Sequence, residues 1–89
     1  MPTREIVTIR NSRGLHARAA AKFVKTAGQF ESDVTVSKGG QTVSGLSIMG
    51  LMMLAAGPGS DIEIEADGPE AAKAMASLIE LVENEFEEN

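Results

Sequence analysis

The sequence predicts one α+β domain, in which a four-stranded antiparallel sheet carries three helices on one face. Its 89 residues are enough for a single modest hydrophobic core. Apolar residues recur at strand spacing in four short segments and at helical spacing in three. The segments follow the order β-α-β-β-α-β-α, and each β-α-β unit must return across one face of the sheet. We therefore expect residues 1–89 to form one domain whose second sheet face is exposed to water.

The first strand and the first helix occupy the N-terminal third. Residues 5–11 (EIVTIRN) are rich in β-forming side chains and predict a strand. The spacing is helical over residues 17–27, and Gly28 ends that helix. Its core-facing positions are Ala20, Phe23 or Val24, and Ala27. Another face of the same helix carries Arg18, Lys22 and Lys25.

A β-hairpin and a short helix are predicted next. Residues 32–38 (SDVTVSK) alternate with both valines on one face, and Gly39-Gly40 is a two-residue hairpin signal before the return strand at residues 41–45. Ser47 is a good N-cap for an apolar helix that extends to Leu54.

The last strand and the last helix complete the pattern. Residues 61–67 (DIEIEAD) alternate most clearly, with the isoleucines inward and the acids outward. Asp67 and Glu70 have the spacing of a capping box around Pro69, which predicts the start of a helix. The acidic end, residues 83–89, is expected to fray. One face of the final helix carries Met75, Leu78, Ile79, Val82 and Phe86.

Composition excludes several functions. The chain has no cysteine, so it forms neither disulfides nor thiolate metal sites. No apolar run reaches the roughly 18 residues of a membrane span, and the N-terminus lacks a secretory apolar stretch, so we expect a cytoplasmic protein. Residues 1–30 carry six basic residues and one acid, whereas residues 61–89 carry ten acids and one lysine. An acidic chain with three aromatic residues is a poor nucleic-acid binder; its basic part suits a phosphate or an acidic protein surface.

His16 is the only histidine, and it stands where the first helix begins. A single histidine without cysteine makes a metal site improbable, so we expect neither metal nor cofactor. No acid occurs between Ile6 and Phe30 to complete a catalytic triad. A neutral imidazole can instead attack a phosphoryl group and later leave it. The free N–H groups of Ala17 and Arg18, together with the Arg18 guanidinium, would then bind phosphate oxygens. The alternative is an ordinary surface histidine beside a helix.

The second candidate feature is the apolar helix behind Ser47. A two-turn helix cannot bury both of its sides in a domain of this size, so part of its methionine-rich surface is expected to be exposed. Exposed methionines form adaptable docking surfaces. The alternative is that they fill a core that is short of aromatic residues. The residues expected to be exposed come from the set Ile48, Met49, Met52 and Met53.

Two stretches of the chain resemble the two signatures of the HPr family: residues 14–20 (GLHARAA) and residues 47–54 (SIMGLMML). The HPr proteins are the histidine-containing phosphocarriers of the bacterial phosphoenolpyruvate-dependent phosphotransferase system. The resemblance covers nearly the whole chain and implies an open-faced β-sandwich. It implies that His16 is phosphorylated at Nδ1, that Arg18 stabilises the phosphate and that Ser47 is a regulatory phosphorylation site. The nitrogen-related branch of the system is the most similar.

The resemblance also implies partners. Enzyme I would donate the phosphoryl group, an enzyme IIA domain would receive it, and an HPr kinase/phosphorylase would act on Ser47. The chain would then be a monomeric relay rather than a stand-alone enzyme. The residues expected to contact these partners are Ala20, Lys22, Lys25, Ile48, Met49, Leu51 and Met52.

Two residues depart from the family pattern. Ala19 stands where most members have proline, which leaves Arg18 less restricted but removes no reactive group. Leu46 stands where many sugar-transport members have lysine, so the docking helix has less positive charge beside it. A second interpretation also remains: a regulatory module that binds an anion or a partner at the two helix N-termini without covalent chemistry.

Overall fold

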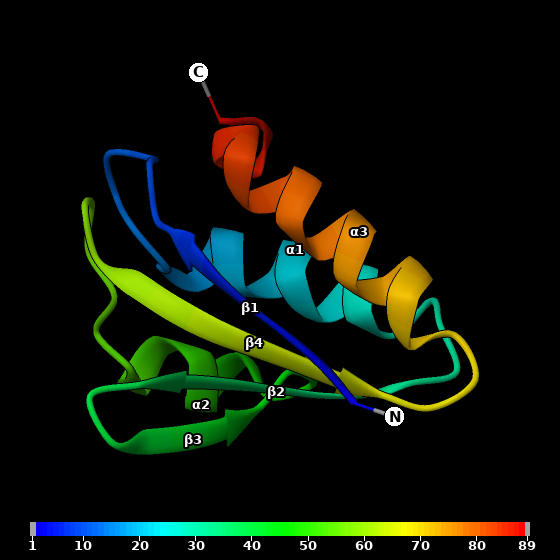
Figure 1. The fold of residues 1–89 in the computed structure, drawn as a ribbon. Coiled ribbons are helices and arrows are strands. Elements are labelled where there is room, and N and C mark those ends of the chain that lie inside the picture. The colour runs from blue at the N-terminus through cyan, green and yellow to red at the C-terminus, as the bar shows by residue number, and fades with distance from the viewer. Residues whose placement is uncertain (1, 89) are drawn as a thin grey trace.

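The computed structural model describes residues 2–88 and confirms the predicted architecture (Figure 1). The sheet order is β1-β4-β2-β3, and every neighbouring pair is antiparallel. Helix α3 packs on β1 and β4, α2 packs beside β3, and α1 contacts both other helices. The elements are β1 (Thr3–Thr8), α1 (Ala17–Ala27), β2 (Asp33–Lys38), β3 (Gln41–Ser44), α2 (Ile48–Met53), β4 (Asp61–Asp67), α3 (Ala71–Glu83) and a 3₁₀ turn, η1 (Glu85–Glu87).

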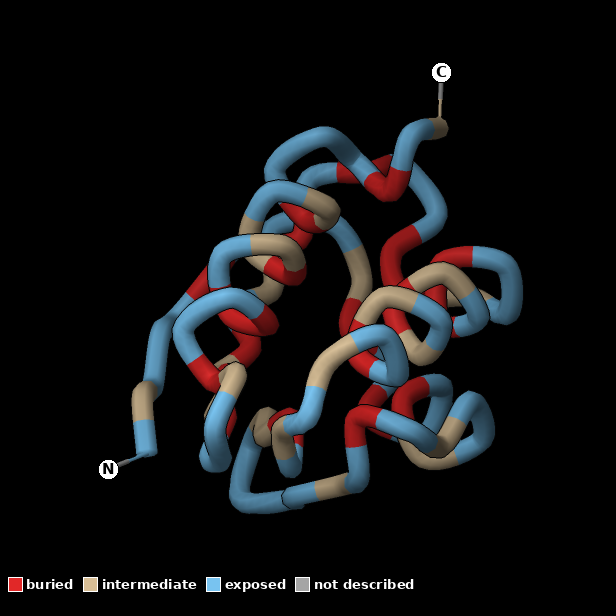
Figure 2. Tube along the Cα trace, turned by 90° about the vertical axis from the view of Figure 1, so that its right-hand side faces the viewer, coloured by how far each residue is buried: buried red, intermediate tan, exposed pale blue. Residues whose placement is uncertain are grey.

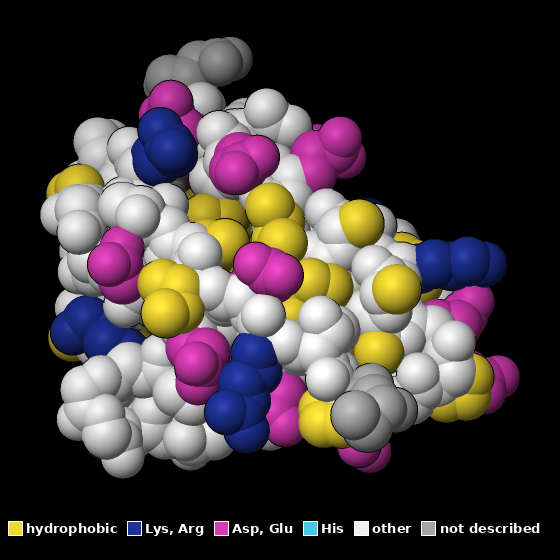
Figure 3. Space-filling model, viewed as in Figure 1, with side chains coloured by type: hydrophobic (Ala, Val, Ile, Leu, Met, Phe, Trp, Pro, Cys, Tyr) yellow, Lys and Arg dark blue, Asp and Glu magenta, His cyan; other side chains and the backbone are white. Residues whose placement is uncertain are grey.

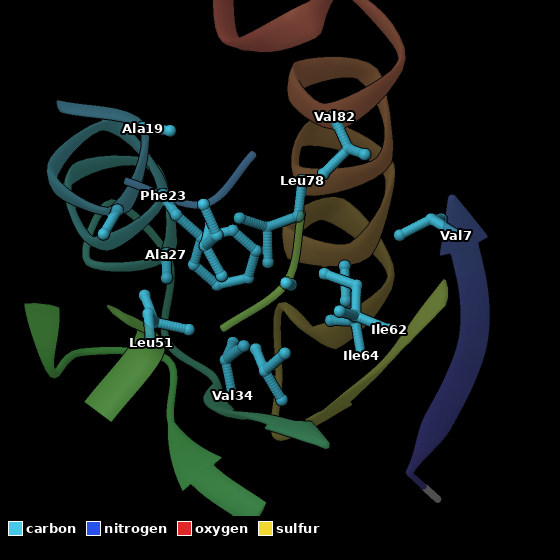
Figure 4. Close-up of a cluster of buried hydrophobic side chains, with 14 of the residues drawn as sticks. Val7, Ala19, Phe23, Ala27, Val34, Leu51, Ile62, Ile64, Leu78 and Val82 are labelled. Atoms are coloured by element: carbon cyan, nitrogen blue, oxygen red, sulfur yellow. The ribbon is translucent and has the colours of Figure 1, made fainter. Parts of the chain in front are cut away.

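The hydrophobic core lies between the sheet and the three helices. In β4 the two isoleucines are buried, while Glu63 and Glu65, which alternate with the buried residues, are half-buried on the other sheet face, as the alternation predicts. Phe23 of α1 is fully buried, whereas Val24 is half-buried, so Phe23 is the core residue of that pair. Each such buried side chain contributes about 1.5–3 kcal/mol relative to exposure. Figure 4 shows the side chains of α1, α3 and the sheet meeting in this core.

The β2–β3 hairpin turns as predicted. Gly39 and Gly40 both have positive φ, 56° and 84°. A two-residue hairpin turn that matches the twist of its strands needs positive φ at both turn residues, and these two glycines supply it.

The first strand is displaced from its predicted range. Strand β1 ends at Thr8, which pairs with Asp61, the first residue of β4. Beyond Thr8 the partner is a loop: the Ile9 N–H donates to the Ser60 carbonyl at 2.8 Å, and the Gly59 N–H donates to the Ile9 carbonyl at 2.8 Å. Residues 9–11 are therefore held without being part of the sheet ladder.

The predicted capping box at the start of α3 is wrong. Strand β4 continues through Asp67, so this residue is not available as a cap. Glu70 occupies the N-cap position but makes no side-chain cap bond. Its carboxylate instead accepts a hydrogen bond from the backbone N–H of Glu31 at 2.8 Å. Glu70 thus ties the start of α3 to the loop between α1 and β2.

The acidic end of the chain is folded, in contrast to the expected fraying. Helix α3 ends at Glu83, and Phe86 lies in a separate turn, fully buried. Glu85, Phe86 and Glu87 all have left-handed backbone, with φ of 55°, 56° and 62°. Such non-glycine conformations cost energy, and the burial of Phe86 offsets that cost. Figure 2 shows that buried positions continue into this C-terminal segment. Asn89 lies outside the described residues.

Candidate functional site

The loop between β1 and α1 places His16 at the first turn of α1. Gly14 has φ 65°, and a Cβ at this position would lie 2.4 Å from the Ala56 carbonyl oxygen, so only glycine fits. The next residue, Leu15, is buried and donates its N–H to the same Ala56 carbonyl at 2.9 Å. These two contacts fix the backbone immediately before His16.

His16 is the N-cap residue of α1, as predicted. Its backbone is extended and its carbonyl accepts the first helical bond, from the Ala20 N–H at 2.8 Å. Its side chain does not cap the helix. The N–H groups of Ala17 and Arg18 have no acceptor within a helix, because helices leave their first N–H groups unpaired. They can therefore donate to an anion at the positive end of the helix dipole.

A hollow lined by charged residues surrounds the imidazole. It has a volume of about 660 Å³, and His16 lies in its wall. The Arg18 side chain is exposed and lines the same hollow. The other cationic residues that line it are Arg10, Arg13 and Lys22, and the acidic residues are Glu85, Glu87 and Glu88. We refer to this site as the His16 hollow.

An acid completes the site, although local sequence predicts none. Glu88 Oε2 and His16 Nε2 lie within hydrogen-bond distance of each other. Glu88 Oε1 accepts a hydrogen bond from Asn11 Nδ2 at 3.0 Å. Residue 88 is 72 positions from residue 16, so no spacing rule links the two. The one signal in the sequence is Phe86, an apolar residue within an acidic end that has a reason to fold back.

The Glu88 carboxyl is held in its ionised form. Burial raises its pKa, but the hydrogen bonds from Asn11 and His16 lower it. The positive charge of Lys22 acts in the same direction as those bonds, and the net shift of the Glu88 pKa is downward. At neutral pH the group is therefore a carboxylate, which accepts hydrogen bonds and donates none.

Lys22 does not belong to a free basic face. It is half-buried, and its Nζ donates to the backbone carbonyl of Phe86 at 2.6 Å. Arg18 and Lys25 remain exposed on α1. Folding also mixes the charges that the sequence segregates, for example where Arg4 pairs with Glu65 at 3.1 Å. Figure 3 shows acidic and basic side chains interspersed on the face that it draws.

The second predicted site, at the start of α2, has the expected geometry. Ser47 is the N-cap, and its hydroxyl oxygen accepts from the Gly50 N–H at 2.9 Å. The exposed large apolar residues around this helix form what we call the apolar patch: Leu46, Ile48, Met49, Met52 and Met53. Met49 is 71% and Met53 is 66% exposed, so the methionines do not simply fill the core.

Two predicted partner contacts are wrong. Ala20 and Leu51 are both 0% exposed and belong to the core, so no partner can reach them in this structure. The reason is that each side chain lies on the side of its helix that faces the core. The other predicted contacts are exposed or half-buried: Lys22, Lys25, Ile48, Met49 and Met52.

The apolar patch reaches the histidine. A shallow hollow beside the first one is lined by His16 and Arg13 on one side and by Met52 and Ala55 on the other. One partner surface can therefore cover the apolar patch and the imidazole together.

Residues 2–88 contain no group of three or more His, Cys, Asp or Glu side chains placed to hold a metal ion. None of the helices described is long and apolar enough to cross a bilayer.

Comparisons with known proteins identify the family of the chain. A family profile described as "PTS HPr component phosphorylation site" matches residues 3–84. The phosphocarrier protein HPr of Neisseria meningitidis serogroup A is 51% identical over 85 residues, which cover 96% of each chain. The protein of the same name from Cupriavidus necator is 52% identical over 81 residues, 91% of each chain. A crystal structure of HPr from Thermoanaerobacter tengcongensis superposes with a TM-score of 0.93 at 38% identity, covering 98% of each chain.

Fold and site together define a small phosphocarrier domain with a histidine at a helix N-terminus and an apolar patch beside it. The chain belongs to the HPr family of the phosphotransferase system.

Proposed function

We propose that His16 accepts a phosphoryl group from phosphorylated enzyme I and passes it to an enzyme IIA domain. The observation that carries this proposal is the position of His16: an imidazole at the N-terminus of α1, in a hollow lined by four cationic and three acidic side chains. The sequence match to the family's phosphorylation site supports it.

In the proposed reaction, Nδ1 of His16 attacks phosphorus while the bond to the donor breaks. The N–H groups of Ala17 and Arg18 and the Arg18 guanidinium stabilise the phosphoryl oxygens, because both groups present donors to negative charge. The same nitrogen leaves with its electron pair when the acceptor attacks. No metal or cofactor is required for this step.

Both partners would dock on the apolar patch and the rim of the His16 hollow, in turn. Exposed methionines suit a surface that must fit more than one partner. A chain that presents one histidine to two partners is most simply a monomer in the cytoplasm. Phosphorylation of Ser47 by an HPr kinase/phosphorylase would place a dianion at the edge of the patch and weaken docking.

The test is incubation with phosphoenolpyruvate and enzyme I, followed by intact mass measurement. The wild-type chain should gain one phosphoryl group that is labile to acid and stable to base. His16→Ala should fold normally and gain none. Phosphate on this variant at wild-type stoichiometry would contradict the assignment.

The same experiment addresses the non-covalent alternative. A module that only binds an anion at the helix N-termini would not gain covalent mass. It would also keep its anion affinity when His16 is replaced by asparagine, because the backbone N–H groups would be unchanged.

A further inference from the structure

We propose that Glu88 is a positioning residue for phosphoryl transfer: its carboxylate, held by Asn11, fixes His16 as the tautomer with the proton on Nε2 and a free lone pair on Nδ1. This inference rests on the proposed function of His16 and adds a role for the C-terminal segment. It identifies a carboxylate–imidazole pair whose members come from opposite ends of the chain.

The tautomer follows from the hydrogen-bond partners. Glu88 Oε2 pairs with His16 Nε2, and an ionised carboxylate can only accept. The proton between them therefore belongs to Nε2. In a neutral imidazole one nitrogen carries the proton and the other carries the lone pair, so Nδ1 is the nucleophile.

Asn11 holds the carboxylate from the other side. It is the only buried polar residue in the described chain, 1% exposed. Its Nδ2 donates both to the Gly14 carbonyl at 2.7 Å and to Glu88 Oε1 at 3.0 Å, while its Oδ1 has no partner. The opposite amide orientation would bring Oδ1 against two acceptor oxygens. Leaving one buried oxygen unpaired is therefore the smaller cost, and it gives Glu88 a fixed donor.

The backbone that carries Glu88 is anchored independently of its carboxylate. Phe86 is fully buried, and its carbonyl accepts from Lys22 Nζ at 2.6 Å. The left-handed turn at Glu85–Glu87 then directs the chain toward the histidine. Glu88 itself is only partly exposed, 18% for its side chain. A change of the Glu88 carboxyl to an amide should thus leave the segment in place.

The Glu88 carboxylate affects phosphoryl transfer because a positive charge forms on the imidazole ring of His16 during the reaction. When Nδ1 bonds to phosphorus, the donor group departs with the electron pair of the broken bond, and Nε2 keeps its proton. The imidazole ring of the phosphorylated residue is then cationic. A negative carboxylate on Nε2–H offsets that charge while it develops and keeps the ring oriented.

The first measurement reads the tautomer without any partner. In ¹⁵N-labelled wild-type protein at neutral pH, the His16 ring should show one protonated nitrogen, Nε2, hydrogen-bonded to a carboxylate. In Glu88→Gln the amide can donate as well as accept, so the ring should show a mixture of tautomers. A wild-type ring that carries its proton on Nδ1 would overturn the inference.

The second measurement is the rate of phosphoryl transfer from enzyme I. Glu88→Gln should slow it at least about tenfold, the order of effect expected for a lost charge-assisted hydrogen bond, with little change in melting temperature. Glu83→Gln is the matched control: it removes the same charge from an exposed residue of the same acidic segment that does not line the His16 hollow, and it should transfer at the wild-type rate. Glu88→Asp, which keeps a carboxylate, should recover part of the loss.

The outcomes separate this inference from the proposed function. If wild-type protein gains no phosphoryl group, the proposed function fails, while the ring tautomer can still be read. If wild-type protein is phosphorylated and Glu88→Gln transfers equally fast or faster, the carboxylate is neutral or obstructive and the positioning role is wrong. Equal slowing in Glu83→Gln would also overturn it, because general charge would then explain the effect.

Discussion

At the scale of single residues, His16 and Glu88 show how a small domain brings an imidazole and a carboxylate together in an open hollow. The histidine is placed by two backbone contacts on the N-terminal side of α1. The glutamate is placed by a buried phenylalanine two residues before it. Neither side chain depends on a neighbour in sequence for its partner, and each is oriented by the fold.

The depressed pKa of Glu88 predicts how the C-terminal segment responds to acid. Its folded-state pKa lies below the ordinary value of 4.5, so its ionised contacts stabilise the fold above that pH and are lost as the pH falls through the folded-state value. The difference in unfolding free energy between wild type and Glu88→Gln should thus be constant near neutrality and shrink below about pH 4.5. Urea unfolding at pH 7 and at pH 3 measures it. If the difference in unfolding free energy grows at low pH instead, the pKa of Glu88 is raised by folding and not lowered.

Ala19 offers a test of the first turn of α1. Its N–H precedes the first helical hydrogen bond, that of Ala20, so proline at this position removes no helical bond. Ala19→Pro should therefore raise stability by about 0.4–1 kcal/mol through the unfolded chain. Thermal melting measures the change. Ala19 is 0% exposed, so a clear loss would show that the core has no room for the two extra carbons.

At the scale of elements, the short helix α2 combines a cap and an exposed surface. Ser47→Ala should lose about 1 kcal/mol, since the Gly50 N–H loses its acceptor. Its phosphoryl transfer should stay normal because the apolar patch is unchanged. Thermal melting and transfer assays on the same sample separate the two effects.

Ser47→Asp should show the reverse pattern. A carboxylate at a helix N-terminus is favourable, so the melting temperature should stay close to that of wild type. The added charge lies beside Ile48 and Met49, which must lose their water on docking, so transfer should slow. If transfer is as fast as in wild type, enzymatic phosphorylation of Ser47 supplies the stronger charge that decides whether the patch is the docking site.

The C-terminal turn is the element that depends most on a single side chain. Phe86→Ala should cost about 3 kcal/mol, at the low end for a buried phenylalanine, because a segment near the chain end can detach rather than leave a cavity. Loss of the His16–Glu88 pair should accompany it, seen as a change in the ¹⁵N signals of the histidine ring. Met49→Ala, at a 71% exposed position, is the control and should leave both unchanged.

Most elements could be predicted because their signals are local. The alternation in β4, the Gly39-Gly40 hairpin and the cap at Ser47 each lie within a few residues of sequence. The positions of His16 and Ser47 at the starts of two helices were predictable for the same reason. The C-terminal turn was not, since three consecutive non-glycine residues with positive φ contradict every local preference. Only the tertiary burial of Phe86 makes that backbone favourable. The contact of Glu88 and the hydrogen bond between Glu70 and the loop before β2 could not be predicted either, because their partners lie far away in sequence.

At the scale of the whole molecule, the exposed cations should guide an acidic partner. Lys25→Glu should slow association with enzyme I several-fold at low salt. The difference should fade above physiological ionic strength, where charges are screened over about 8 Å. Lys22 is the poorer site for this test, because its charge reversal would also disturb Phe86. Stopped-flow association at several salt concentrations measures the rate.

Lys38→Glu is the matched control for steering. It makes the same change in net charge on β2, at the hairpin and away from the residues that line the His16 hollow. If it slows association as much as Lys25→Glu does, net charge rather than a local surface controls the encounter.

The contact between Glu88 and His16 also affects where a label or an affinity tag should be attached. A segment fused after residue 89 follows closely on Glu88, which contacts His16, so it can pull the glutamate away from the histidine. The N-terminal strand starts at the opposite end of the sheet (Figure 1). Tags, fluorophores and surface-immobilisation handles therefore belong at the N-terminus, and transfer rates obtained with C-terminal fusions should be remeasured after their removal.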